Sequence, residues 1–143
     1  MESARTDGEA VRGADILITA TNSATPVVES DWVGPGVHIN AMGSNQAQRR
    51  ELPEDLVRRC DPIVVDSREQ GRMESGDLLL ALRDDEWDRV TELSEVASRA
   101  VGRTSDTAIT LFKSNGLAVE DVAAAGCVYE RALAAGAGRD LYS

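Results

Sequence analysis

The chain has 143 residues, with 25 acidic against 15 basic side chains and a formal charge of -10. This acidic balance argues against a nucleic-acid partner, because contact with phosphates requires a concentrated basic face. No apolar run reaches the roughly 18 residues that span a bilayer, and residues 1–10 are too polar for a signal peptide. We therefore expect a cytoplasmic protein with no membrane partner.

The basic residues are unevenly distributed between the two types. Lys113 is the only lysine, and the remaining fourteen basic residues are arginines. An acidic surface with little lysine is typical of a cytosol of high salt, where charge repulsion is screened. A genome of high GC content, which encodes arginine in place of lysine, is the alternative explanation.

The chain has two cysteines, Cys60 and Cys127, which lie far apart in the sequence. Neither belongs to a CxxC pair or a Cys/His cluster, so the sequence predicts no metal site and no disulfide framework. We expect both side chains to be small, buried and apolar.

Apolar runs and helical spacing alternate along the chain. Residues 1–13 are polar and helix-like, and the first strong strand, 14–21, is apolar on both faces, as in a buried parallel sheet. The remaining elements are predicted from apolar runs for strands and from three-to-four-residue spacing for helices. They are strands 37–42, 62–67 and 108–112, and helices 53–59, 73–82, 86–100 and 117–135.

The alternation of strands and helices predicts an α/β fold with a doubly wound parallel sheet, followed by a long C-terminal helix. In such a sheet, ligands bind beyond the carboxyl ends of the strands. Two polar segments occupy such positions, residues 19–26 after the first strand and 40–45 after the second. Each is either a ligand-binding turn or a solvated loop, and Gly43 allows close approach of a ligand to the backbone.

Four more features are explained without a catalytic role. His38 lies inside the second strand, which favours a core histidine over a catalytic base. Glu51, which follows two arginines, is predicted to lie in a solvated charged turn rather than an anion site. Asp66 ends the third strand and is positioned to cap the next helix, and capping also explains residues 74–77.

A dinucleotide-binding domain usually begins with a strand, a GxGxxG turn and a helix, followed about twenty residues later by an acidic side chain. The glycines of this chain have no such spacing. Gly34, Gly36 and Gly43 do not fit it, and Gly136 and Gly138 follow a predicted helix.

Four segments resemble, in the same order, the ornithine cyclodeaminase/mu-crystallin family of NAD(P)-dependent enzymes. They are ADILITATNSATPVV, GVHINAMGSNQAQRREL, IVVDSREQGRMESGDLLLAL and ITLFKSNGLAVEDVAAAGCVYERA. Members of this family are more than twice as long, and the resemblance covers only their C-terminal portion. It implies a partial Rossmann-like domain at 14–115 and, at 116–143, a helix that returns to a substrate and dimerisation domain outside this chain.

The resemblance also implies roles for residues at the strand ends. Thr21 and the turn Asn40, Ala41, Met42 and Gly43 correspond to groups beside the nicotinamide of NAD or NADP, and Ser114 corresponds to a further cofactor contact. Asn115 corresponds to a position whose backbone faces the substrate. Lys113 does not correspond to the substrate-binding lysine of the family, which lies, with its arginines, in the other half. No metal is implied.

Asn45 departs from the family pattern, which places an aspartate for proton transfer at this position in cyclodeaminases and archaeal alanine dehydrogenases. An amide cannot ionise. The resemblance therefore favours an imine reductase or amino-acid dehydrogenase over a cyclodeaminase. The expected substrate is an L-amino acid or its imine, and the expected full-length assembly is a homodimer.

We expect this chain alone to be inactive, because the phosphate turn and the substrate-binding cations lie outside it. Two alternatives to a simple enzyme fragment stay open. The chain is a truncated product or an interaction module without activity, or it is one half of a split enzyme.

Overall fold

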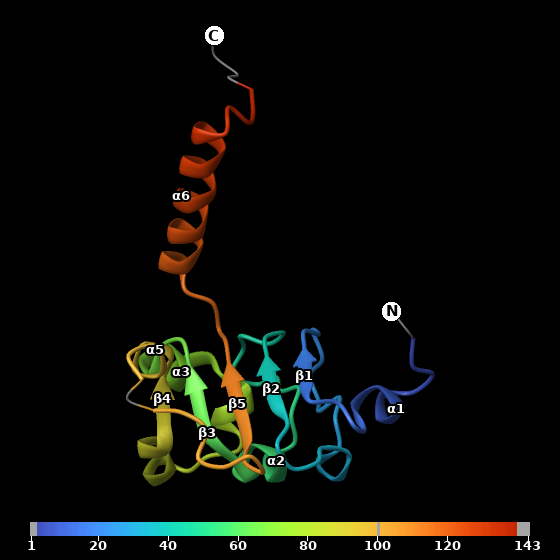
Figure 1. Cartoon of the computed structure of the whole chain (residues 1–143). Coiled ribbons are helices and arrows are strands. Elements are labelled where there is room, and N and C mark those ends of the chain that lie inside the picture. Colours follow the sequence, from blue (N-terminus) through green and yellow to red (C-terminus); the bar gives the residue numbers. More distant parts are fainter. Residues whose placement is uncertain (1–2, 100, 140–143) are drawn as a thin grey trace.

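A parallel sheet of five strands forms the centre of the computed structural model, which describes residues 3–99 and 101–139 (Figure 1). The strands are ordered β1-β2-β5-β3-β4 across the sheet, and each pairs in parallel with its neighbours. Their bounds are β1 Ile16–Thr19, β2 His38–Ala41, β3 Cys60–Val65, β4 Val90–Glu92 and β5 Ile109–Lys113. The α/β fold with a parallel sheet is therefore confirmed.

The helices are short except for the last one. They are α1 Asp7–Val11, α2 Glu54–Arg59, α3 Arg68–Glu74, α4 Gly76–Leu79, α5 Leu93–Ala97 and α6 Ala118–Ala134, with 3-10 turns at Ser30–Trp32 and Asp84–Arg89. The long helix predicted at 117–135 and the short helix predicted at 53–59 are confirmed. Pro53 takes the N-cap position of α2, just before the first turn that was predicted for it.

Two predicted helices are wrong. The segment 86–100 contains the end of a 3-10 turn, the strand β4 and the helix α5. Val90 is fully buried because it pairs with Ile63 of β3, a long-range contact that outweighs the helix-like spacing of its neighbours. The segment 73–82 is divided between α3 and α4 at Ser75, whose backbone is not helical (φ -82°, ψ 87°). The next residue, Gly76, packs against the carbonyl of Arg49 with no space for a Cβ.

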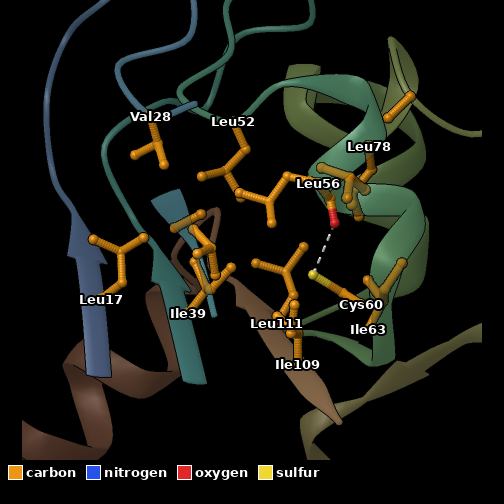
Figure 2. Close-up of a cluster of buried hydrophobic side chains, with 14 of the residues drawn as sticks. Leu17, Val28, Ile39, Leu52, Leu56, Cys60, Ile63, Leu78, Ile109 and Leu111 are labelled. Atoms are coloured by element: carbon orange, nitrogen blue, oxygen red, sulfur yellow. Dashed lines mark hydrogen bonds between the residues drawn. The ribbon is translucent and has the colours of Figure 1, made fainter. Parts of the chain in front are cut away.

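The hydrophobic core lies against one face of the sheet (Figure 2). Leu52 and Leu56 pack there over Leu17, Ile39 and Leu111 of the strands, and four of these five are completely buried. Burying a leucine or isoleucine side chain contributes roughly 1.5–3 kcal/mol, so this cluster holds the helical layer on the sheet.

The opposite face is open at β1. Ile16 and Ile18 are each 61% exposed, so the prediction of a strand buried on both faces is wrong for β1. The same face is also partly open on the interior strand β2, where His38 and Asn40, the register partners of Ile16 and Ile18, are half-buried. The long helix α6 is also exposed: it extends away from the sheet and has no buried residue (Figure 1).

No helix in the described part of the chain is long and apolar enough to cross a membrane.

Candidate functional site

The carboxyl ends of β1, β2, β5 and β3 meet at one edge of the sheet. The register places Thr19 opposite Ala41, Ala41 opposite Lys113, and Lys113 opposite Val65. Because all four strands run in the same direction, the residues that follow them are brought together at this edge. This is where an open parallel sheet binds ligands.

The sequence-predicted site residues lie at or close to this edge. Thr21 is exposed, and Met42 is 52% exposed beyond the end of β2. Ser114 and Asn115 are half-buried after β5, and Asn45 is exposed in the loop after β2.

Two of the predicted residues lie within β2 rather than after it. Asn40 is half-buried, and the side chain of Ala41 is fully buried in the core. The carbonyl oxygen of Ala41 accepts a hydrogen bond of 3.1 Å from the Ser114 amide. Ala41 therefore joins the two predicted turns through its backbone.

Glu51 is the centre of the hydrogen bonds at this edge, although sequence reasoning placed it in a solvated turn. The side chain is completely buried, so that prediction is wrong. Its carboxylate accepts hydrogen bonds from Thr19 Oγ1 at 3.0 Å, from the Thr21 amide at 2.6 Å and from the Gly43 amide at 2.9 Å. The donors come from segments far away in the sequence, so no local pattern identifies the role of Glu51.

Lys113, at the end of β5, and Asp77, in α4, lie inside the fold next to these strand ends, and both side chains are fully buried. The Lys113 ammonium donates hydrogen bonds to the carbonyl oxygens of Ala41, Ser44 and Ser114. Asp77 Oδ1 accepts from the amides of Glu51 at 2.7 Å and of Leu52 at 2.9 Å. Asp77 is thus a buried acceptor for the Glu51 segment rather than the helix cap expected at 74–77.

The two buried charges attract each other without a hydrogen bond. Lys113 Nζ is 3.7 Å from Asp77 Oδ2, which is too long for a hydrogen bond and leaves a coulombic contact. Burial lowers the pKa of Lys113, and the neighbouring carboxylates oppose this effect. Burial also raises the pKa of Asp77, against the hydrogen bonds from Leu52 and Glu51 and the charge of Lys113.

Asp66 joins the end of β3 to the turn between β5 and α6. Its Oδ2 atom accepts hydrogen bonds from Ser114 Oγ at 3.0 Å and from the amides of Asn115 at 2.9 Å and Gly116 at 2.7 Å. The predicted helix cap is wrong for Asp66, because Ser67, one residue later, caps α3 by accepting from the Gln70 amide.

Two buried polar atoms at this edge have no hydrogen-bond partner within residues 3–99 and 101–139. They are Asp66 Oδ1, an acceptor, and Asn115 Nδ2, a donor. Buried polar groups are usually paired, so these two atoms are exceptions to that rule.

Other reactive side chains of the described chain have structural surroundings. His38 Nδ1 is 2.7 Å from Thr110 Oγ1 on the neighbouring strand, but the side chain is half-buried and lies outside the hydrophobic core in which it was predicted. Cys60 is buried, its thiol donates to the Leu56 carbonyl (Figure 2), and burial raises its pKa to about 12. Cys127 is exposed on α6, so the prediction that both cysteines are buried is wrong for this one.

A cavity of about 250 Å³ lies beside the edge strand β1, next to the strand-end turns. Leu17, Ile18, Thr19 and Thr21 line it from β1 and the turn after it, and Val11 lines it from α1. This hollow therefore connects the unpaired side of β1 with the candidate site at the carboxyl ends of the strands.

The model of the ornithine cyclodeaminase/mu-crystallin family matches residues 1–136. A Δ1-pyrroline-2-carboxylate reductase of Bacillus cereus is 41% identical over 137 residues, which is 93% of this chain and 42% of the relative. The mouse ketimine reductase mu-crystallin is 45% identical over 122 residues, which is 85% of this chain and 37% of the relative.

The fold also matches a solved structure, that of Thermococcus litoralis Δ1-pyrroline-2-carboxylate reductase in complex with NADH and L-proline. The TM-score is 0.86 at 38% identity, with 96% of this chain and 44% of the other covered. The chain thus spans less than half the length of the relatives it matches. It belongs to the ornithine cyclodeaminase/mu-crystallin family.

Proposed function

We propose that this chain is the C-terminal portion of an NAD(P)-dependent oxidoreductase that acts on an L-amino acid or its imine. One observation carries the proposal: the segments that the family resemblance assigns to cofactor and substrate turns, at Thr21, Met42–Gly43 and Ser114–Asn115, lie at one carboxyl edge of a parallel sheet. The reductase relatives, one of them bound to NADH and L-proline, support the same reaction class.

The residues of this edge fit the nicotinamide end of a dinucleotide. The nicotinamide carboxamide offers both a donor and an acceptor, and the edge holds the unpartnered Asn115 Nδ2 and Asp66 Oδ1. Thr21 and Met42 present exposed side chains on the neighbouring strand ends. These residues would hold the nicotinamide, while the sequence contains no GxGxxG turn for the pyrophosphate.

When bound, the nicotinamide supplies the hydride that is exchanged with the α-carbon of the substrate. The residues of this chain contribute orientation and electrostatics. The turn at Ser114 and Asn115, held by Asp66, would face the substrate, and the exposed Asn45 amide can donate and accept hydrogen bonds without changing its charge. We therefore infer imine reduction or amino-acid oxidation rather than ornithine cyclisation.

Two surfaces of this chain, the outer side of β1 and the helix α6, have no partner among the described residues. The outer edge of β1 has unpaired backbone groups, and an edge of this kind binds a further strand or aggregates. The exposed α6, with Val122, Tyr129 and Leu133 between 62% and 71% exposed, presents a second apolar surface. We infer that both surfaces are covered by the remaining half of the enzyme, supplied by the same polypeptide or by a separate one, in a homodimer.

The test compares this chain with a completed enzyme. The completed enzyme joins the chain to the part of the Bacillus cereus reductase that it does not match. Calorimetry with NADH and NADPH should show weak or no binding by the chain and micromolar binding by the completed enzyme, since backbone amides and the helix dipole at a phosphate turn supply much of the affinity.

Micromolar binding by the chain alone would show that its own residues hold the whole cofactor. A completed enzyme that folds but binds neither dinucleotide would contradict the proposed function. In that case an inactive truncated product or an interaction module becomes the better interpretation.

A further inference from the structure

Glu51 lies behind the candidate site rather than within it. The side chain is completely buried, and its two carboxylate oxygens are both occupied by donors from the ends of β1 and β2. Two of the three donors are backbone amides, those of Thr21 and Gly43. The same carboxylate therefore fixes both turns that are proposed to contact the nicotinamide.

The two turns are in direct contact, with no space between them for a side chain. A Cβ at Gly43 would lie 2.2 Å from the Thr21 carbonyl oxygen, 2.3 Å from the Thr21 nitrogen and 2.5 Å from Glu51 Oε1. Because the first two atoms belong to the backbone, they cannot rotate away. The spacing of the turns is thus set by backbone contact and by the carboxylate that bridges them.

Glu51 is itself held in place from behind. Asp77 Oδ1 accepts hydrogen bonds from the Glu51 and Leu52 amides, which orients the segment that carries the carboxylate. Lys113, 3.7 Å from Asp77 Oδ2, donates to carbonyl oxygens at the ends of β2 and β5. The three buried residues together connect β1, β2 and β5 at their carboxyl ends.

We propose that Glu51 is a positioning residue, which holds the Thr21 and Gly43 turns at the spacing that the nicotinamide requires. This inference rests on the proposed function for its ligand, while the arrangement of the turns rests on the hydrogen bonds alone. A role limited to fold stability is the competing hypothesis. The two hypotheses differ in what the conservative variant Glu51→Gln does to cofactor recognition.

Glu51→Gln preserves the shape of the side chain but replaces one acceptor oxygen with a donor amide. The three donors are divided between the two oxygens, with the Thr21 amide on Oε1 and the Thr19 hydroxyl and Gly43 amide on Oε2. Whichever way the glutamine amide is turned, one backbone N–H faces another N–H. One of the two turns must therefore move.

The matched control is Glu92→Gln, the same chemical change on another strand end. Glu92 is the last residue of β4, which is the outer strand on the side of the sheet opposite β1. Its Oε1 accepts a hydrogen bond of 2.9 Å from the Arg68 amide. Both variants remove a carboxylate that binds backbone N–H groups. Only Glu51 is bonded to the proposed cofactor turns.

In the completed enzyme we expect Glu51→Gln to raise the KM for NADH or NADPH about tenfold, as for the loss of one buried hydrogen bond, while Glu92→Gln changes it less than about twofold. In the wild-type chain, amide hydrogen exchange at Thr21 and Gly43 should be slowed by about a hundredfold relative to an unfolded peptide. Glu51→Gln should remove much of this protection at one of them.

Three results would overturn the inference. The first is a Glu51→Gln enzyme with a lowered melting temperature but an unchanged KM for the dinucleotide. The second is a Glu92→Gln enzyme with the same rise in KM. The third, which applies even if Glu51→Gln does not fold, is fast exchange of the Thr21 and Gly43 amides in the wild-type chain. Since exchange needs no cofactor, it tests the turns even if the proposed function fails.

Discussion

Gly43→Ala tests the contact between the ends of β1 and β2. The added Cβ would lie 2.2 Å and 2.3 Å from backbone atoms of Thr21, whereas ordinary contacts begin near 3.4 Å. The turns must therefore separate by about 1 Å, and overpacking of this kind costs roughly 1–3 kcal/mol. Separation also weakens the two backbone hydrogen bonds to Glu51, each worth roughly 1–3 kcal/mol if the donor is left unsatisfied.

The expected total is a loss of at least about 3 kcal/mol in the free energy of unfolding, a large part of the roughly 5–15 kcal/mol typical of a domain. The matched control is Gly126→Ala on α6, where a Cβ meets nothing within 4 Å. Within a helix this change stabilises by roughly 0.5–1 kcal/mol. The same substitution should therefore have opposite effects at the two positions.

The assay is urea unfolding of both variants at one fixed protein concentration, since self-association makes the midpoint depend on concentration. Gly43→Ala should lower the midpoint without changing the slope with urea, and Gly126→Ala should raise it slightly. Equal midpoints for the two variants would refute the close contact of the strand ends and, with it, the bridging role of Glu51.

Four further predictions concern Lys113, the two cysteines and Asn45. Lys113→Met should cost about 3–5 kcal/mol, because it leaves Asp77 as an uncompensated buried charge; urea unfolding that shows under about 1 kcal/mol would contradict this. Thiol labelling at pH 8 should modify Cys127 quickly and the buried Cys60 only on unfolding, and Cys127→Ser should abolish the fast phase. Burial raises the pKa of the Cys60 thiol from 9.0 to about 12, so the unfolded chain loses this proton at a lower pH than the folded chain. The contribution of the protonated thiol to the free energy of unfolding is therefore complete below pH 9 and is lost as pH rises from 9 through 12. A free energy of unfolding that is constant across that window would argue against this burial. In the completed enzyme, Asn45→Asp should raise any ornithine-cyclising activity by about 10²–10⁴-fold if the side chain reaches the amine, and an unchanged rate would remove the role assigned to that position.

The strands that could be predicted are those with continuous apolar runs. β1, β2, β3 and β5 fall within two residues of their predicted bounds, since each run buries its alternate apolar side chains in the core. β4 was missed because it has only three residues and its apolar positions also fit a helical period. Its pairing with Ile63, far away in the sequence, determines its conformation.

The candidate site was predictable only in outline. The polar turns after β1 and β2 indicated a ligand edge, because strand ends in a parallel sheet converge. The burial of Glu51 and Asp77 could not be predicted, since a charged residue next to arginines or at a helix start is usually solvated. Their donors lie 8–32 residues away from them along the chain, so only the folded structure brings these groups together.

The central claim, that this chain completes an NAD(P)-dependent oxidoreductase, is tested most directly by turnover. The completed enzyme should oxidise NADH or NADPH in the presence of Δ1-pyrroline-2-carboxylate and yield L-proline, while this chain alone should not. The intact Bacillus cereus reductase serves as the positive control. A completed enzyme that folds and dimerises but neither reduces this or another imine nor oxidises an L-amino acid, under conditions where the control is active, would contradict the account.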